Sequence, residues 1–282
     1  MRQVTANRPS PEPREPGAPP ILGCSEARRA SAGAPTIALG AGIPAAIGVC
    51  HPQSVAELWV CQLGLVPYDE ALALQERLRE ARQAGAIADV LLLLEHPPVY
   101  TRGRRTDAAE LPFGEEWYAE RGIESFEVDR GGRATYHGPG QLVGYPIVAV
   151  GAIVDFLRLM EAAIVAALTQ EGIDARGGGD RPTGVWVADR KIASLGIHVA
   201  RRVTTHGFAV NVDNDLTPFE WIVPCGLEGV QMTSLARETG RVDCMACFRK
   251  RVAFEFAQRL GARQRIVSPA RLRQTLGTLV GA

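Results

Sequence analysis

The chain has 282 residues, of which 31 are basic and 31 acidic, so its formal net charge at pH 7 is zero. This balance argues against a nucleic-acid binder, which carries a basic excess, and the six scattered cysteines favour a reducing cytosol over a secreted disulfide scaffold. No apolar run reaches the roughly 18 residues that span a bilayer, so no membrane partner is expected.

The first 54 residues are expected to lie outside the fold. Residues 1–20 hold six prolines and few large apolar side chains, and such a segment buries too little surface to offset the entropy of ordering. The apolar residues 34–50 lie too far from the start for a signal peptide and are interrupted by Pro44. We predict a disordered extension or a misassigned start codon over 1–54, a catalytic domain over 55–265 and a helical tail over 266–282.

The folded part is predicted to begin with a strand at 57–63. Residues 67–84 have apolar side chains on one face and are bounded by proline and glycine, which predicts an amphipathic helix. Residues 87–94 form a continuous apolar run that ends at the Pro-Pro pair 97–98. Such a run is typical of a strand that is covered on both faces.

The remaining chain mixes strands and helices without regular βαβ spacing, which favours an α/β fold with a mixed sheet (α+β). Residues 183–212 alternate in the manner of strands, with a turn near Asp189 and Arg190. Further elements are expected as a short helix at 115–121, strands at 125–129 and 141–149, and helices at 153–170 and 244–280.

A glycine-rich loop follows at residues 130–140, with the sequence RGGRATYHGPG. Glycine allows backbone to approach a ligand closely, and the loop also carries two arginines and His137. It matches neither a Walker loop nor the dinucleotide-binding fingerprint. A plain surface turn is the alternative, but the composition favours a ligand-binding loop. Within this loop, His137 is a candidate for contact with the substrate, and a structural role for this histidine remains the alternative.

Lys191 is one of only two lysines in the chain, beside 29 arginines. Codon bias explains the general trend, but arginine cannot be deprotonated whereas lysine readily changes its protonation state when buried. Lys191, Ala193 and Leu195 are expected to share one strand face, which places the amine beside apolar neighbours. A partly desolvated lysine can act as a base at neutral pH, and Gly196 leaves room for a ligand near Ser194–Gly196.

Cys225 lies between Pro224 and Gly226 at the end of an apolar run. This pair of neighbours predicts a sharp turn that exposes the thiol, and a thiolate is a good acyl acceptor when a nearby cation favours it. The alternative is a small buried apolar residue. Cys244 and Cys247 lack the second pair that a zinc site requires, and the five histidines have no metal-ligand spacing, so no metal is expected.

Taken together, these segments resemble the lipoyl(octanoyl) transferase family over roughly residues 58–262. The resemblance rests on five motifs in the family's order and spacing. They are HPPVYTRGRR at 96–105, RGGRATYHGPGQLVGYP at 130–146, RKIASLGIHV at 190–199, HGFAVNV at 206–212 and PCGL at 224–227.

The resemblance implies the mixed α/β fold of biotin and lipoate ligases. It also implies transfer of an octanoyl group from octanoyl-acyl carrier protein to a lysine of lipoyl domains, in the E2 subunits of 2-oxoacid dehydrogenases and in the glycine cleavage H protein. Family members use a cysteine/lysine dyad. Cys225 matches the nucleophile that forms the acyl thioester, and Lys191 matches the residue that lowers its pKa and transfers the proton.

The family's substrate-binding segments correspond to a loop and to two short stretches of strand. A thioester is already activated, so neither ATP nor another cofactor is expected, and the composition suits a cytoplasmic bacterial protein. Tyr136, Leu195 and Phe208 are hypothesised to lie near the octanoyl chain. The matching positions are Arg130, Gly131, Gly132, Arg133, Ala134, Thr135, Tyr136, His137, Ser194, Leu195, Gly196, Gly207, Phe208 and Ala209.

Three alternative functions remain at this point. An ATP-dependent lipoate or biotin ligase would share the fold, although the chain has no GxGRxGR-like nucleotide loop. A protein that binds lipoyl domains or carrier protein without catalysis would not need Cys225. A redox protein would use Cys244 and Cys247 instead.

Overall fold

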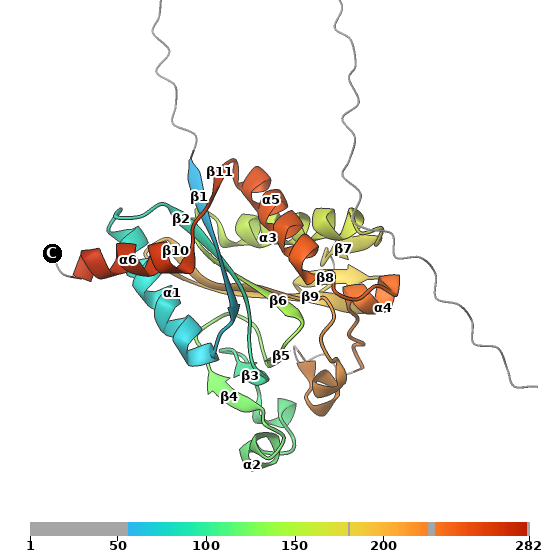
Figure 1. The fold of residues 1–282 in the computed structure, drawn as a ribbon. Helices are drawn as coiled ribbons and strands as arrows, with labels where there is room; N and C mark the ends of the chain where they lie inside the picture. Colours follow the sequence, from blue (N-terminus) through green and yellow to red (C-terminus); the bar gives the residue numbers. More distant parts are fainter. Residues whose placement is uncertain (1–55, 180, 225–228, 281–282) are drawn as a thin grey trace, which may run out of the picture. The chain divides into compact units, whose positions relative to one another are not determined.

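An eight-stranded mixed sheet forms the centre of the described part of the chain (Figure 1). The structure, a computed structural model, describes residues 56–179, 181–224 and 229–280. The strand order is β11-β1-β2-β6-β10-β9-β8-β7, with parallel pairing at β11–β1 and β1–β2 and antiparallel pairing at every other junction. The expected mixed α/β sheet is therefore confirmed.

The elements of the main sheet are joined by helices and by a smaller sheet of order β4-β3-β5. The strands are β1 (Glu57–Leu65), β2 (Asp89–Glu95), β3 (Val99–Arg102), β4 (Glu124–Glu127), β5 (Thr135–His137), β6 (Gln141–Ile147), β7 (Ala175–Gly177), β8 (Gly184–Val187), β9 (Arg190–Ala200), β10 (Val203–Asn211) and β11 (Arg263–Ile266). The helices are α1 (Tyr68–Gln83), α2 (Glu115–Ala119), α3 (Ile153–Thr169), α4 (Leu235–Thr239), α5 (Met245–Leu260) and α6 (Pro269–Val280), with short 3-10 helices η1 (Ala108–Glu110) and η2 (Thr217–Trp221).

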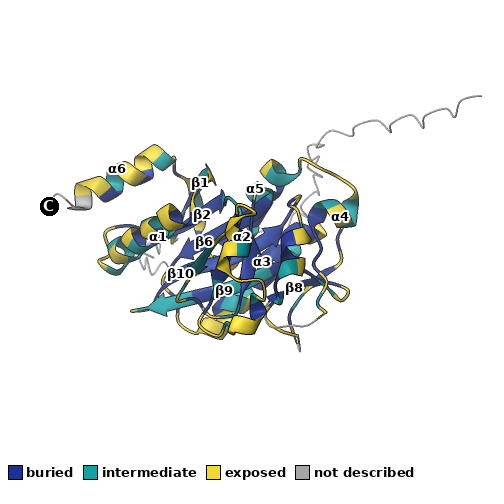
Figure 2. Ribbon diagram, turned by 90° about the horizontal axis from the view of Figure 1, so that it is seen from below, coloured by how far each residue is buried: buried dark blue, intermediate teal, exposed yellow. Residues whose placement is uncertain are grey.

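Helices cover both faces of the main sheet, and Figure 2 shows the buried residues concentrated in the strands between them. On one face α3 and α5 pack through residues such as Met160 and Phe256. On the other face α1 and α6 pack through Leu78 and Leu272. Strand β2 contributes side chains to both cores, which explains why residues 90–94 are all fully buried and all apolar.

The expected strand at 57–63 and the expected helices at 67–84 and 153–170 are confirmed with small changes at their ends. The prediction of one helix over 244–280 is wrong. Helix α5 ends at Gly261, whose φ of +68° stops the helix, and residues 263–266 then pair in parallel with β1. Within the described ranges, no helix has the length and apolar character that crossing a bilayer requires.

Candidate active site

A cavity of about 440 Å³ lies where β9 and β10 meet the loop that precedes β5. Four arginines and one lysine line this cavity. Arg130 and Arg133 belong to the glycine-rich loop, and the others are Arg105, Arg181 and Lys191. None of the described lining residues is an aspartate or a glutamate. The guanidinium groups of these four arginines give the cavity a cationic lining, which suits a reaction in which negative charge develops on an oxygen or a sulfur.

The two predicted substrate-binding stretches of strand lie directly opposite each other. Gly196 pairs with Gly207, and the neighbouring residues pair in the same register. Leu195 is paired with Phe208, and Ser194 is paired with Ala209. All six residues of these three pairs line the cavity. The antiparallel register thus brings together two segments that the sequence presents separately.

The glycine-rich loop is fastened across β9 at Gly131. The amide of Gly131 donates to the carbonyl of Ile197 at 2.9 Å. A β-carbon on Gly196 would lie 2.6 Å from the carbonyl oxygen of Gly131, so only glycine permits this approach. Arg130 extends the connection, because its Nη2 donates to the carbonyl and the hydroxyl of Thr101 at 2.8 and 2.7 Å.

Glu110 supports the same loop from η1. Its carboxylate is 4% exposed and accepts from the backbone amide of Ala134 at 3.1 Å, and it forms an ion pair with Arg133. The carbonyl of Glu110 also accepts from the amide of Val223 at 2.9 Å. The buried Glu110 therefore contacts both the glycine-rich loop and the segment that precedes Cys225.

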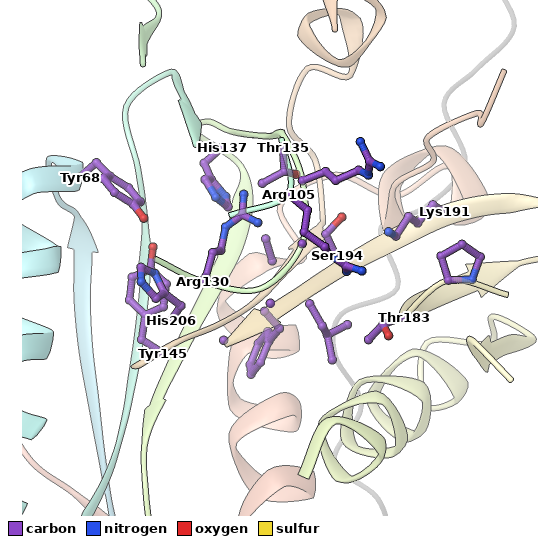
Figure 3. A pocket seen from close by; sticks show the side chains of 18 of the residues that line it. Tyr68, Arg105, Arg130, Thr135, His137, Tyr145, Thr183, Lys191, Ser194 and His206 are labelled. Atoms are coloured by element: carbon purple, nitrogen blue, oxygen red, sulfur yellow. The ribbon is translucent and has the colours of Figure 1, made fainter. Parts of the chain in front are cut away.

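Lys191 lies at the start of β9 with its side chain 2% exposed, and it lines the cavity (Figure 3). Its Nζ lies 5.5 Å from the centre of the Trp186 ring. Its backbone amide donates to the carbonyl of Gln231, and its carbonyl accepts from the amide of Thr233, both at 2.9 Å. Cys225 lies outside the described residues, but Gln231 follows it by only six positions.

Tyrosine and histidine rings gather at the opposite end of the cavity from Lys191 (Figure 3). Nδ1 of His137 lies 2.7 Å from Oε1 of Gln141, which accepts a hydrogen bond from it. Burial lowers the pKa of His137 to about 3. Tyr145 lies with its hydroxyl 2.8 Å from Nε2 of His96, and burial lowers the pKa of His96 to about 4. Both imidazoles are therefore neutral at physiological pH.

His206 also lines this end of the cavity, and its backbone adopts a conformation that is uncommon for a residue other than glycine. Its φ is +57°, and its amide donates to Oε1 of the fully buried Gln75 at 2.7 Å. Its Nε2 lies 2.9 Å from Oδ1 of Asp129, the residue that precedes the glycine-rich loop. A non-glycine residue in this region of φ is held by its surroundings, here by α1 and the loop.

Most of the predicted substrate-binding residues line the cavity, but three described ones do not. Gly131, Ala134 and Tyr136 lie beside it, and the Tyr136 ring instead packs against Tyr100 and Phe219 at centroid distances of 5.6 and 5.4 Å. The hypothesis that Tyr136 lies near the acyl chain thus gains no support from its packing.

Several lining residues were not predicted from the sequence. Arg105, Tyr145 and His206 lie inside the motifs that carried the family resemblance, so these motifs already contained the signal. Tyr68 had no such signal, because it opens an amphipathic helix that reads as ordinary core. The other additional lining residues are Arg181, Pro182 and Thr183.

Two further cysteines, Cys244 and Cys247, lie away from the cavity. Cys244 precedes α5 and Cys247 lies in its first turn. No group of three or more histidine, cysteine, aspartate or glutamate side chains among the described residues is placed to hold a metal ion.

This fold and this site define a class of protein. Residues 67–257 match the family described as the lipoyl protein ligase A/B catalytic domain. A putative lipoate protein ligase from T. acidophilum has a similar fold, with a TM-score of 0.62 and 19% identity over 80% of this chain and 94% of that one. A lipoate-protein ligase A bound with ATP has a TM-score of 0.60 and 20% identity over the same shares.

Closer relatives narrow the class further. The chain is 42% identical over 225 residues to an octanoyltransferase of Caldicellulosiruptor saccharolyticus, covering 78% of this chain and 96% of the relative. It is 45% identical over 202 residues to an octanoyltransferase of Geobacter sulfurreducens, covering 70% and 83%. The chain belongs to the octanoyltransferase family and is an acyltransferase, so the expected family and fold are confirmed.

Proposed function

We propose that the chain transfers an octanoyl group from octanoyl-acyl carrier protein to a lysine of a lipoyl domain, through a thioester on Cys225. Family membership supports the octanoyl transfer. The hydrogen bond between the Lys191 amide and Gln231, six residues beyond Cys225, carries the proposal of a Lys191/Cys225 pair. This hydrogen bond joins strand β9, which carries Lys191, to the segment that follows Cys225 in the sequence.

In the first step, neutral Lys191 accepts the thiol proton of Cys225, and the thiolate attacks the carbonyl carbon of the donor thioester. The bond between that carbon and the carrier's sulfur then breaks. The leaving thiolate takes the proton from the Lys191 ammonium, which returns the lysine to its neutral form. A thiolate suits this role because it is a good nucleophile and a good leaving group.

In the second step, the neutral amine of the acceptor lysine attacks the carbonyl carbon of the acyl-enzyme. The bond to the Cys225 sulfur breaks as the amide forms, and Lys191 takes the surplus proton from the amine. The resulting ammonium stabilises the thiolate that is released. The cationic lining of the cavity also favours the negative charge of both tetrahedral intermediates.

The partners and conditions follow from this chemistry. The donor is already activated as a thioester, so the reaction uses neither ATP nor a metal ion. A solved T. acidophilum relative of the same fold is described together with its E2 lipoyl domain, which supports an E2 lipoyl domain as the acceptor. We include lipoyl domains of 2-oxoacid dehydrogenase E2 subunits and the glycine cleavage H protein as acceptors because the family resemblance implies them. We place the reaction in the cytoplasm, where carrier protein and these complexes occur together.

The direct test is the intact mass of the protein after mixing with octanoyl-acyl carrier protein without ATP. We expect a gain of one octanoyl group that hydroxylamine removes. The gain is absent from Cys225→Ser and is retained by the matched variant Cys244→Ser, whose sulfur lies away from the cavity lining. An adduct on Cys225→Ser, or none on the folded wild-type protein, contradicts the thioester mechanism.

The same assay separates the alternatives. Transfer of free octanoate that depends on ATP would indicate a ligase of the same fold. Retention of full activity after alkylation of Cys225 would indicate a non-catalytic role for the thiol. Loss of activity in a Cys244→Ser, Cys247→Ser double variant would indicate a redox function.

A further inference from the structure

We infer that Phe208, seated on Gly144 and flanked by Leu195, forms the wall that limits the length of the acyl chain. This inference rests on the proposed function, because it assigns part of the cavity to the alkyl chain of the thioester. It concerns the described residues of β6, β9 and β10 only.

The cavity offers few surfaces that suit an alkyl chain. Among its described lining residues, the side chains that carry no polar atom are Pro182, Leu195, Phe208 and Ala209. Leu195 and Phe208 are direct cross-strand partners, so they form one continuous apolar surface. An alkyl chain gains most by burying its methylenes against this pair.

The apolar pair also lies at a suitable distance from the proposed chemistry. Leu195 follows Lys191 by four positions in β9, which corresponds to about 13 Å along a strand. An extended eight-carbon acyl chain is shorter than this span, but the Lys191 side chain itself extends toward Ser194 and so covers part of it (Figure 3). A carbonyl held beside Lys191 would therefore bring the far end of the chain to Leu195 and Phe208.

Phe208 can occupy its position only because residue 144 is a glycine. Phe208 pairs with Gly144 in the register of β6 and β10, and its ring covers the glycine. A β-carbon on Gly144 would lie 2.1 Å from Cζ of the ring and within 2.6 Å of both Cε atoms. A side chain at position 144 must displace the ring away from β6, toward β9 and the cavity.

On the side away from the cavity, Phe208 packs against the hydrophobic core. Phe208 is 3% exposed and belongs to the cluster formed with α3 and α5. A smaller residue at position 208 would extend the cavity toward this cluster, whereas a displaced ring would shorten it. A smaller side chain at position 208 and an added side chain at position 144 are thus expected to change the preferred acyl-chain length in opposite directions.

The test is the specificity constant for donor carrier proteins that bear six, eight, ten or twelve carbons. We expect Phe208→Leu and Phe208→Ala to shift the preference toward ten or twelve carbons. Each additional buried methylene contributes about four-fold in kcat/KM, so two contribute about fifteen-fold. We expect Gly144→Ala to shift the preference toward six carbons by a similar factor.

Leu142→Ala is the matched control, because Leu142 lies two residues from Gly144 in the same cluster but does not line the cavity. It should lose stability and keep the wild-type preference. If the wild-type protein transfers octanoyl but Phe208→Leu and Gly144→Ala keep its preference, the inference is wrong. If the wild-type protein transfers no acyl group from any carrier, the proposed function itself fails. If Phe208→Ala does not fold, the chain-length preference is measured on Phe208→Leu alone.

Discussion

The side chain of Lys191 occupies the space that a side chain at position 184 would need. A β-carbon on Gly184 would lie 2.6 Å from Cε of Lys191 and 2.8 Å from the carbonyl oxygen of Ala193. Gly184 also has a φ of +152°, and its amide donates to Oε1 of the buried Glu161 at 2.9 Å. Neighbouring strands β8 and β9 thereby hold the lysine stem in one place.

Gly184→Ala should therefore displace the amine of Lys191. We expect kcat to fall about 100-fold, which is the order of loss that a displacement of about 1 Å causes at a reacting group. Overpacking should also lower the free energy of unfolding by about 1–3 kcal/mol. Steady-state kinetics and urea denaturation measure both effects. Gly151→Ala is the control, because no atom lies within 4 Å of its added β-carbon, and wild-type kcat in Gly184→Ala would contradict the prediction.

Glu110→Gln should loosen the glycine-rich loop. The carboxylate accepts from the amides of Asp107 and Ala134 at 3.0 and 3.1 Å, and a glutamine must present an NH₂ group to one of these donors. We expect the free energy of unfolding to fall by about 1–3 kcal/mol. We expect the KM for the donor to rise about ten-fold, which corresponds to about 1.4 kcal/mol. Glu116→Gln, exposed on α2, should change neither value, and an unchanged KM in Glu110→Gln would refute a positioning role.

Stability should decrease below neutral pH because of the buried histidines. Burial lowers the pKa of folded His137 to about 3, whereas an unfolded histidine titrates near 6.5. Between these values the unfolded state binds more protons, so the free energy of unfolding falls as pH drops from about 6.5 toward 3. Each such histidine contributes about 1.4 kcal/mol per pH unit within this window.

Urea denaturation at pH 7.5, 6.0 and 5.0 measures this dependence. His137→Gln removes one titrating group and should reduce the slope between pH 6.0 and 5.0 by up to about 1.4 kcal/mol per pH unit. His96 keeps a residual slope in this variant, because burial lowers its pKa as well. Equal slopes in the two proteins would show that His137 is not buried in its neutral form.

Leu272→Ala should destabilise the fold without changing the active site. Leu272 is 1% exposed and packs from α6 into the cluster that contains Leu78 of α1. Removing a leucine side chain from such a core costs about 2–5 kcal/mol. Thermal unfolding measures the loss, with the exposed Gln274→Ala as the control. A variant that unfolds like the wild-type protein would mean that α6 does not pack on α1 in solution.

The strands and helices with strong local patterns were predictable. The apolar run that became β2 and the long apolar helix α3 carry their burial in their own residues. Strand β11 was missed because its pattern is short and its pairing is remote. Arg263 is aligned with Glu57, more than 200 positions earlier, and this partner rather than the local sequence makes the segment a strand.

The candidate site was predictable only in part, for a similar reason. Lys191, Gly196 and Gly207 stand out by residue type, and the structure brings all three to one cavity. Tyr68 and Glu110 do not stand out, because a tyrosine at a helix start and a glutamate in a short turn are common. The position of Cys225, the predicted nucleophile, lies outside the described residues.

Local chemistry and periodicity indicated an α/β fold and singled out Lys191 and Cys225 as candidate residues. Acyl transfer was indicated by the resemblance of five sequence motifs to a known family. Tertiary structure decided which residues surround Lys191. The pairing of Gly196 with Gly207, the hydrogen bond from Ala134 to Glu110 and the seat of Phe208 on Gly144 each join distant positions of the chain. Contacts of this kind depend on strand register and loop closure, which single stretches of sequence do not encode.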